Sequence, residues 1–306
     1  MKRKNKPDPV SGVIVIDKHT GVTSHRIVQI LRKLYDTPRV GHTGTLDPLA
    51  TGVLPVLIGR AVKASEFLLS SDKEYEAVLQ LGVATDTQDI TGEVIATSDH
   101  IPKEEEVQTA IASFIGDIQQ IPPMYSAIKI DGRKLVDAAR AGETIQRQSR
   151  PVHIASMQAE KLSECEYRLQ VTCSKGTYIR TLCADIGEKL GCGGALASLR
   201  RTRSGLFTLT DAHTIEELEE ASLEERISMV RPCETLFADC PSLCVSDFQA
   251  KLIRGGTELY QKKLKTNFPV GTHVRLYQNG TFFALGEVRE YENRGSAIKP
   301  IRLFVL

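Results

Sequence analysis

A single carboxylate, Asp47, lies within a polar stretch that is the first candidate for chemistry in this sequence. Residues 41–52 contain three glycines and one proline, a composition that predicts a loop, and a loop of this length in a compact domain is often functional. No tandem acidic residues and no lysine-bearing phosphate cradle flank Asp47, so its natural active role is that of a lone nucleophile or base. With an ordinary pKa of about 3.9 it would be ionised at neutral pH. Because Asp before Pro is also a common turn starter, the spacing alone leaves a structural role open.

Two further acidic residues, Asp86 and Asp89, have a spacing that could indicate a metal pair. Their Thr, Gln and Gly neighbours instead favour a turn. Together with Asp47 they would suit a metal-dependent nuclease, an alternative that predicts sensitivity to chelators. Cys240 and Cys244 could form half of a zinc site, but a second pair at matching spacing is missing, so no metal site is predicted.

Composition points to an ordinary globular chain. The 306 residues are 41% hydrophobic and 25% charged, and no apolar run approaches the roughly 20 residues that a membrane span needs. The basic residues 1–6 are not followed by an apolar stretch of signal-peptide length. Seven cysteines form an odd set without the spacing of a disulfide framework, which indicates a reducing compartment. We therefore expect a cytoplasmic protein without membrane contact.

Charge is distributed unevenly along the chain, although the formal net charge is only +1. Residues 129–150 carry six Lys or Arg against three acids, and residues 251–265 carry five against one. Residues 211–225 carry seven acids and no Lys or Arg. Such segregation can give a nearly neutral protein a locally positive face that suits a phosphate backbone. Ordinary solvated helix faces would give the same pattern, so charge alone leaves both readings open.

Strands and helices are mixed along the first 240 residues. Residues 12–17 are expected to form a buried strand, and Thr23 or Ser24 can cap the helix that follows. The remaining elements are expected as strands at 75–83 and 167–173, an extended stretch at 121–130, and helices at 103–114, 134–141, 215–225 and from about 175–180 to 190. This pattern predicts an α+β domain built on a mixed, largely antiparallel sheet.

The composition changes near Pro241. From residue 245 the sequence indicates short strands separated by turns, the clearest of them at Asn279-Gly280 because Asn-Gly is a strong hairpin signal. Gly255-Gly256, Gly271 and Arg294-Gly295 are expected to form the other turns. We therefore expect a small β-rich module at 245–306.

Residues 41–54, with the sequence GHTGTLDPLATGVL, resemble the signature loop of the TruB family of pseudouridine synthases. Three further blocks resemble the same family in the same order, namely Lys73-Glu74-Tyr75-Glu76-Ala77, residues 173–182 and Leu199-Arg200-Arg201-Thr202. The resemblance extends from about residue 10 to 205 and more weakly through the tail. Residues 250–256, with the sequence AKLIRGG, resemble part of a PUA domain.

The resemblance implies a role for each residue of one site. Asp47 is implied to be the catalytic aspartate and Arg180 its partner. Tyr75 is implied to stack on a flipped uracil, and His42 to lie against the flipped nucleotide. Tyr178 and Leu199 are implied to line the pocket. Extruding a base costs a few kcal/mol, and stacking it on an aromatic ring returns about 1 to 3 kcal/mol, so Tyr75 can offset much of that cost.

The implied reaction converts uridine 55 in the T-arm of tRNA to pseudouridine. It breaks the bond from N1 to C1′ and joins C5 to C1′, so it needs no redox carrier, no cofactor and no metal. Whether Asp47 adds to the sugar or acts as a base at C2′ stays open.

The resemblance also implies the layout of the chain. We expect a basic tail at 1–9, a catalytic domain at 10–240 and a PUA-like RNA-binding domain at 245–306. A mobile thumb is expected at about 123–151, where Arg133, Lys134 and Arg140 would contact the RNA backbone. Neutralising these three side chains should weaken tRNA binding and flatten its salt dependence. A monomer that needs no guide RNA is expected.

One alternative from another class is a non-catalytic tRNA-binding or folding factor on the same scaffold. Replacing Asp47 by Asn separates the two hypotheses. If Asp47 is chemical, the substitution abolishes pseudouridine formation and leaves tRNA affinity nearly intact.

Overall fold

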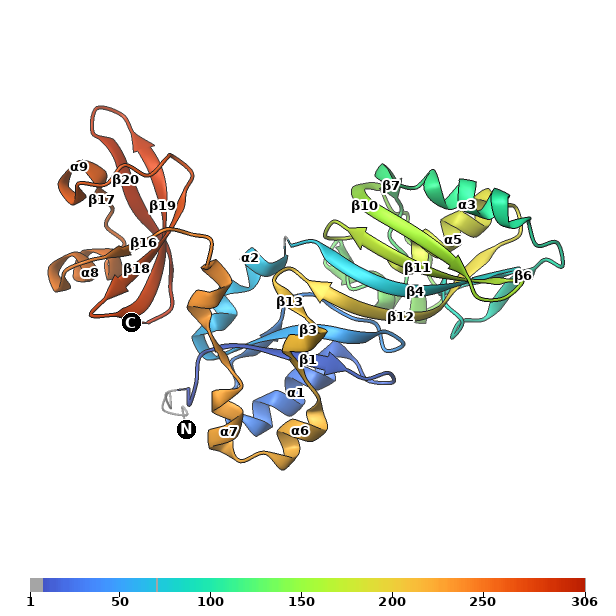
Figure 1. The fold of residues 1–306 in the computed structure, drawn as a ribbon, viewed down its shortest axis with the longest axis horizontal. Coiled ribbons are helices and arrows are strands. Elements are labelled where there is room, and N and C mark those ends of the chain that lie inside the picture. Colours follow the sequence, from blue (N-terminus) through green and yellow to red (C-terminus); the bar gives the residue numbers. More distant parts are fainter. Residues whose placement is uncertain (1–7, 70, 306) are drawn as a thin grey trace.

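The computed structural model describes residues 8–69 and 71–305. The predicted basic tail at 1–9 therefore lies, apart from its last two residues, outside the described residues. Figure 1 shows an elongated molecule in which a long curved sheet carries helices, and a second, smaller sheet lies at one end. The predicted α+β class with a β-rich C-terminal part is confirmed by this arrangement.

The large sheet has eleven strands within the described residues, with the central order β14-β1-β3-β12-β4-β11-β10-β7. Its strands are β1 (Gly12–Lys18), β2 (Val40–His42), β3 (Thr51–Ile58), β4 (Lys73–Leu81), β7 (Gly116–Gln120), β10 (Arg150–Lys161), β11 (Glu166–Cys173), β12 (Gly194–Ser204), β13 (Phe207–Thr208), β14 (Ala212–His213) and β15 (Arg231–Pro232). In the described part of this sheet, only the pairs β1–β14 and β3–β12 are parallel. The sheet is therefore mixed and largely antiparallel, as predicted.

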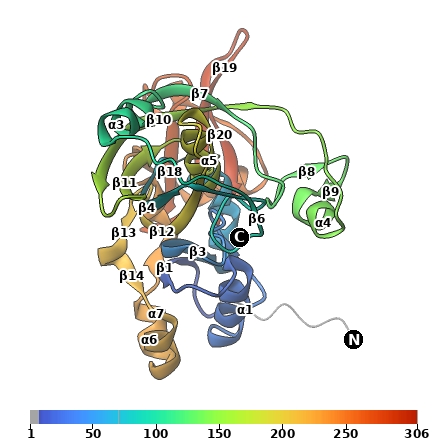
Figure 2. The ribbon, with the colours of Figure 1, turned by 90° about the vertical axis from the view of Figure 1, so that its right-hand side faces the viewer.

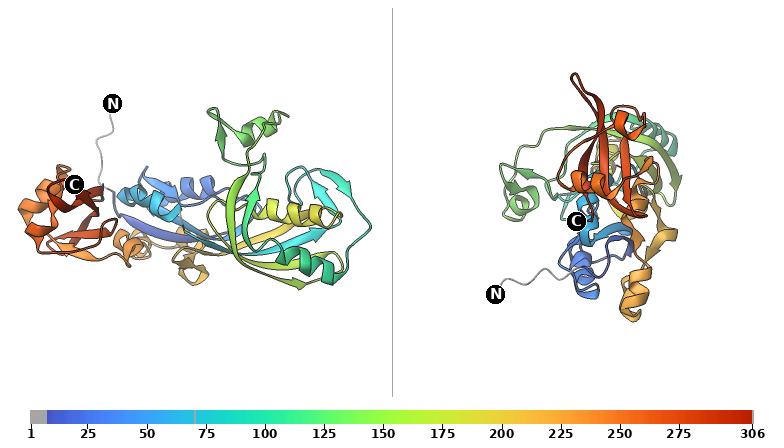
Figure 3. Two further views of the ribbon diagram at one scale, coloured as in Figure 1. Left: turned by 90° about the horizontal axis from the view of Figure 1, so that it is seen from above. Right: turned by 90° about the vertical axis from the view of Figure 1, so that its left-hand side faces the viewer.

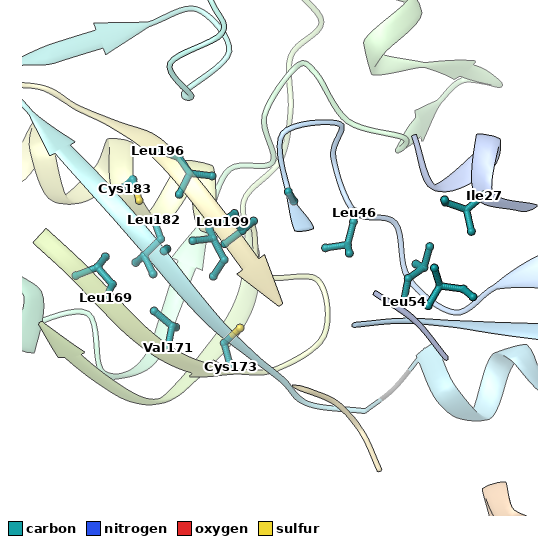
Figure 4. Packing of buried hydrophobic residues seen from close by; sticks show 14 of the residues in the cluster. Ile27, Leu46, Leu54, Leu169, Val171, Cys173, Leu182, Cys183, Leu196 and Leu199 are labelled. Carbon is teal, nitrogen blue, oxygen red and sulfur yellow. The ribbon is translucent and has the colours of Figure 1, made fainter. Parts of the chain in front are cut away.

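The neighbouring strands β1 and β3 are buried on both faces. Their alternate residues enter different clusters, because side chains along a strand point to opposite sides. Ile14 and Leu54 join one core together with the helices, whereas Val13 and Val53 join the opposite core. Figure 4 shows part of the first core, where Leu54 lies near Ile27 of the first helix. Burial on both sides explains why these strands read as continuous apolar runs.

Helices of the first core cover one face of the large sheet. They are α1 (Ser24–Leu34), α3 (Glu104–Ala112), α5 (Ile179–Lys189) and α6 (Ile215–Glu220). Thr23 caps α1 as predicted, since its hydroxyl accepts a hydrogen bond from the Arg26 N–H at 3.1 Å. The remaining helices before residue 240 are α2 (Ser65–Leu69), α4 (Leu135–Arg140), α7 (Leu223–Ser228) and the 3-10 helices η1 (Gly59–Ala64), η2 (Leu209–Asp211) and η3 (Cys233–Phe237).

The single acidic helix expected at 215–225 is wrong, because the structure has two. α6 ends at Glu220, and Ser222 starts α7 with a capping box in which its hydroxyl accepts from the Glu225 N–H. A serine cap competes with helix continuation at this point. The extended stretch expected at 121–130 forms a strand only at its end, where β8 (Lys129–Ile130) pairs with β9 (Arg133–Lys134).

The small elements β8, β9 and α4 stand away from the body. Figure 2 shows them to one side of the large sheet, joined to it by two long irregular segments. The view from above in Figure 3 also shows them projecting from the body. They lie within residues 123–151, which we call the thumb segment. A separate two-stranded hairpin is formed by β5 (Val83–Thr85) and β6 (Val94–Thr97).

The second sheet has the order β16-β18-β19-β20-β17. Its strands are β16 (Ser242–Cys244), β17 (Leu259–Tyr260), β18 (His273–Gln278), β19 (Thr281–Tyr291) and β20 (Gly295–Leu303). The turn at Asn279-Gly280 joins β18 to β19 as predicted. The turn expected at Gly255-Gly256 instead follows a helix, α8 (Asp247–Arg254), which Ser246 caps; a shorter helix, α9 (Gln261–Leu264), comes later. The strand-turn reading missed α8 because it overlooked this cap and the helical spacing of Ala250 and Ile253.

An apolar cluster fixes the second sheet to the first. Phe282 of β19 and Phe304, which follows β20, belong to one cluster with Val13 and Val53 of the first sheet, and Phe237 contacts both phenylalanines. Across the described ranges, no helix has the length and apolar character needed to cross a membrane.

Candidate active site

The loop between β2 and β3, residues 43–50, is held at both ends and in its middle. We call it the catalytic loop. Ser24, at the start of α1, accepts from the Leu46 N–H at 2.8 Å and donates to the Leu46 carbonyl at 3.0 Å. The Leu46 side chain is only 3% exposed and points into the first core (Figure 4). Lys18 reaches the same loop from β1, where its ammonium donates to the Pro48 carbonyl at 3.4 Å. These contacts on both sides fix the position of Asp47.

Arg180 brings a guanidinium to Asp47 from the first turn of α5. Its Nε lies 2.9 Å from Oδ2 of Asp47, and its Nη1 lies 3.7 Å from Oδ2 of the buried Asp89. The remaining donors reach the carbonyls of Thr87 at 2.9 Å and Tyr125 at 2.8 Å. Arg180 is 4% exposed, so its orientation is set by the protein. The ion pair implied by the family resemblance is therefore present in the geometry.

The Asp47 carboxyl does not have its ordinary acidity. Burial raises its pKa above the usual value, Arg180 opposes that rise, and the carboxylate of Asp89 adds to it. The side chain is 36% exposed, so a face of the carboxylate remains open to an incoming group. The expectation of an unperturbed pKa of about 3.9 is thus wrong, because the loop is packed more closely than its glycines and polar residues indicate.

Asp47 and Arg180 open into a pocket of about 250 Å³. This is below the range of roughly 300–1,000 Å³ that is typical of sites for whole small molecules. Its lining includes residues of the catalytic loop, of β4 and β12, of the segment before α5 and of the thumb segment: Thr43, Gly44, Thr45, Leu46, Asp47, Lys73, Tyr75, Ser126, Ala127, Ser174, Gly176, Thr177, Tyr178, Ile179, Arg180, Leu199 and Arg201. A pocket of this size fits one part of a larger substrate, such as a single base.

Three of the predicted pocket residues line it together. Tyr75 comes from β4, Leu199 from β12 and Tyr178 from the cap of α5. Burial raises the pKa of both tyrosines, so their hydroxyls are neutral at physiological pH. Two flat rings and one aliphatic side chain are suited to the faces of a planar base.

His42 lies at the end of β2 and is not part of the lining of this pocket. Its Nδ1 accepts from the Gly44 N–H at 3.4 Å. Burial lowers the pKa of His42, and the nearby Arg201 and His25 lower it further, so the ring is neutral at pH 7. The structure thus places His42 beside the catalytic loop, where it contacts Gly44 and does not line the pocket that contains Asp47.

Arg201 is a pocket residue to which the sequence reasoning assigned no role. It is 1% exposed, donates from Nε to the Val53 carbonyl at 2.7 Å and from Nη2 to the Gly44 carbonyl at 3.2 Å. Its contact with the Tyr75 hydroxyl partly offsets the effect of burial on the pKa of that tyrosine. The available signal was its place in the block Leu199-Arg200-Arg201-Thr202, which the family resemblance had already singled out.

Asp86 and Asp89 lie in the turn between β5 and β6, as their neighbours predicted. Asp86 accepts from the Glu93 N–H and from the Tyr125 hydroxyl. Asp89 accepts from Thr87 and Thr91 through one oxygen and faces Arg180 with the other. Within residues 8–69 and 71–305, no cluster of three or more His, Cys, Asp or Glu side chains has a metal-binding arrangement.

The three predicted RNA-backbone residues all lie on the projecting thumb segment, away from Asp47. Arg133 and Lys134 form β9, and Arg140 ends α4. Arg133 is engaged already, because its guanidinium contacts both carboxylate oxygens of Glu143, at 2.5 and 3.1 Å.

Comparisons with known proteins place this site in a family. Residues 32–179 match the family model described as TruB family pseudouridylate synthase, N terminal domain, and residues 180–238 match that of the tRNA pseudouridylate synthase B C-terminal domain. The tRNA pseudouridine synthase B of Aromatoleum aromaticum is 43% identical over 280 residues, which cover 91% of this chain and 89% of that protein. That of Alkaliphilus oremlandii is 42% identical over 296 residues, covering 96% and 98%.

The fold is similar to that of a chain in the crystal structure of a Cbf5-Nop10-Gar1 complex. The TM-score is 0.69 at 25% identity, and the similarity covers 96% of this chain and 85% of that one. Because the family models match consecutive parts of the chain and the relatives span nearly all of it, this chain belongs to the TruB family of pseudouridylate synthases.

Proposed function

We propose that the protein isomerises uridine 55 in the T-arm of tRNA to pseudouridine, with Asp47 acting on a flipped-out nucleotide. The observation that carries the proposal is the Asp47 carboxylate, held 2.9 Å from the buried Arg180 in the lining of a pocket of about 250 Å³. The names of the relatives, tRNA pseudouridine synthase B, support tRNA as the substrate class.

Asp47 and Arg180 share the chemical work. The carboxylate must be ionised either to add to the sugar or to take a proton at C2′, and Arg180 favours the ionised form against the burial that opposes it. Arg180 also fixes the direction of the carboxylate, because its other donors are held by two carbonyls. A preoriented group of this kind avoids reorganisation during the reaction.

Tyr75, Tyr178 and Leu199 hold the base while it changes its bond to the sugar. The bond from N1 to C1′ breaks, the base turns within the pocket, and C5 joins C1′; C5 then loses its proton and N1 gains one, so atoms balance without a co-reactant. Apolar and aromatic walls permit such a turn because they bind the faces of the base rather than one edge. His42 lies beside the catalytic loop and contacts the nucleotide outside the base pocket.

The rest of the chain supplies RNA contacts in this proposal. The catalytic domain occupies residues 10–240 and a PUA-like domain residues 245–306, where Lys251 and Arg254 lie in the last turn of α8. The thumb segment, with Arg133, Lys134 and Arg140, contacts the phosphate backbone. The protein selects tRNA as a monomer without a guide RNA, in the cytoplasm.

The alternative, a tRNA-binding or folding factor without catalysis, is tested by one substitution. Purified protein and Asp47→Asn are incubated with an unmodified tRNA transcript, and pseudouridine is mapped at single-nucleotide resolution. We expect product at position 55 with the parent protein and a loss on the order of 10⁴-fold or more with the variant, while tRNA affinity stays nearly unchanged. Product elsewhere would correct the position. Residual product together with lost binding would favour the alternative.

A further inference from the structure

One hydroxyl of the pocket has no partner at hydrogen-bonding geometry among residues 8–69 and 71–305. Ser126 lies in the thumb segment where it leaves the body, is 6% exposed and lines the pocket with Asp47 and Tyr75. Its Oγ is buried and has no geometric hydrogen-bond partner in the described part of the chain. A buried hydroxyl without a partner is unfavourable, and such groups in a native protein call for a ligand or another explanation.

The other hydroxyls of the pocket wall are accounted for. Ser174 Oγ accepts from the His153 N–H at 2.9 Å, Thr177 donates to the Ser174 carbonyl at 2.9 Å, and Thr43 donates to the Pro55 carbonyl at 3.4 Å. Thr45 is exposed to water. Burial raises the pKa of Tyr178 and a side-chain interaction of its hydroxyl with Ser126 partly opposes that rise, yet within the described ranges Ser126 Oγ has no partner at full hydrogen-bonding geometry. Ser126 therefore differs from its neighbours.

The backbone holds Ser126 in place from two sides. The carbonyl of the preceding Tyr125 accepts from Arg180 Nη2 at 2.8 Å, and the carbonyl of Ser126 accepts from the Val136 N–H of α4 at 3.1 Å. The first contact ties the residue to the partner of Asp47, and the second ties it to the helix of the thumb segment. An unpaired hydroxyl at a position this well anchored is preorganised for a substrate group.

We infer that Ser126 is a substrate-binding residue whose hydroxyl forms a hydrogen bond with the polar edge of the flipped base. The inference rests on the proposed function and adds to it a contact from the thumb segment. A base edge fits better than a phosphate, because Ser126 is neutral and its pocket neighbours Tyr178 and Ile179 offer flat or apolar surface. A hydroxyl can donate or accept, so it can follow the base as it turns from the N1-linked to the C5-linked form.

The test uses Ser126→Ala in the full-length protein, with Ser149→Ala as the matched control because Ser149 is an exposed serine of the same segment outside this pocket. We expect kcat/KM for a tRNA transcript to fall about five- to tenfold for Ser126→Ala, the range for one neutral hydrogen bond, and to stay unchanged for Ser149→Ala. The unfolding temperature of Ser126→Ala should equal or exceed that of the parent, because an unpaired buried hydroxyl is removed.

Binding to two RNAs locates the contact. In an Asp47→Asn background, which prevents turnover, Ser126→Ala should weaken binding of a uridine-containing T-arm hairpin by a similar factor and leave binding of the same hairpin with an abasic residue at that position unchanged. An equal loss on both RNAs would overturn the inference, as would unchanged kcat/KM. The inference would also be overturned if Ser126→Ala and Tyr178→Phe each lowered the unfolding temperature by the same amount and the double variant lowered it no further. That result would show that the Ser126 hydroxyl bonds to Tyr178 in the free protein. If the parent protein itself makes no pseudouridine, the proposed function fails instead.

Discussion

The catalytic loop and the thumb segment are both irregular connections beside the same pocket, yet they are built differently. The loop is short, lies between two strands of the large sheet, and is anchored by Leu46, Ser24 and Lys18. The thumb segment is long, projects from the body (Figure 2), and has only Leu135 and Ala138 fully buried in its own helix. The difference suggests two roles: the loop holds reacting groups in a fixed geometry, and the projecting part of the thumb segment presents cations to a partner.

Removing Arg180 should have the largest effect that tests this division. Arg180→Met deletes the group that orients Asp47, and we expect kcat to fall roughly 10²- to 10³-fold, as for other preoriented charged donors. Because Arg180 opposes the rise in the pKa of Asp47, its loss raises that pKa further. Single-turnover rates across pH should therefore show an acidic limb displaced to higher pH.

Arg180→Lys is the matched control for the charge alone. It keeps a cation near Asp47 but cannot reach both the Thr87 and Tyr125 carbonyls. Its acidic limb should stay close to that of the parent while its rate falls. A limb that does not move in Arg180→Met would contradict the view that the ion pair tunes Asp47.

Replacing one buried leucine by alanine in the catalytic loop and one in the thumb segment should distinguish global from local unfolding. Leu46→Ala leaves a cavity in the core of the large sheet, and we expect it to lower the free energy of unfolding by about 3 kcal/mol. Leu135→Ala removes the buried side chain of α4 and should melt that helix alone. Thermal unfolding and amide hydrogen exchange of residues 129–140 distinguish the outcomes. A large drop in the global unfolding temperature of Leu135→Ala would show that the thumb segment is integral to the body.

Prediction from the sequence succeeded where local pattern and global packing agree. The runs at β1 and β3 and the capped helix α1 follow from apolar period and a threonine cap, and the loop around Asp47 follows from its glycines and proline. The pairing of Asp47 with Arg180 came from the family resemblance, because no local rule links residues so far apart in the chain. The geometry agrees with it.

Features that depend on burial could not be read in advance. The raised pKa of Asp47 and the buried position of Arg201 arise from strands that meet only in the fold. Sequence charge counts placed Arg133 among free cations, but folding pairs it with Glu143 ten residues later. The sequence likewise does not show that the Ser126 hydroxyl lacks a geometric hydrogen-bond partner in the described structure, because that depends on which groups the fold brings near it.

Neutralising the thumb cations should have a moderate effect confined to RNA binding. The triple variant Arg133→Gln, Lys134→Gln and Arg140→Gln should bind tRNA about tenfold more weakly near 0.1 M salt, and its log Kd should depend on log salt with a slope smaller by roughly 2. The reduction is below three because Arg133 is already paired with Glu143.

Glu143→Gln sharpens the same comparison from the opposite side. Removing this carboxylate frees Arg133 for phosphate, so tRNA binding should tighten and the salt slope should steepen slightly. Titrations of both variants at several salt concentrations provide the measurement. An unchanged slope in the triple variant would rule out phosphate contacts by these residues.

The smallest effect concerns the stability cost of the catalytic carboxylate. Burial raises the pKa of Asp47 in the folded protein above its value in the unfolded chain. Stabilisation by the protonated form is therefore complete below the unfolded pKa and is lost as pH rises through the folded pKa. At neutral pH the ionised Asp47 opposes folding, so Asp47→Asn should unfold at a higher temperature than the parent. The difference in unfolding temperature should narrow as the pH is lowered toward 4.

Asp89→Asn is the contrasting control. It breaks the contacts with Thr87 and Thr91 and faces Arg180 without charge, so it should unfold at a lower temperature than the parent. If Asp47→Asn were instead destabilised at every pH, pairing with Arg180 would outweigh burial, and the catalytic loop would be held by the same ion pair that it uses for chemistry.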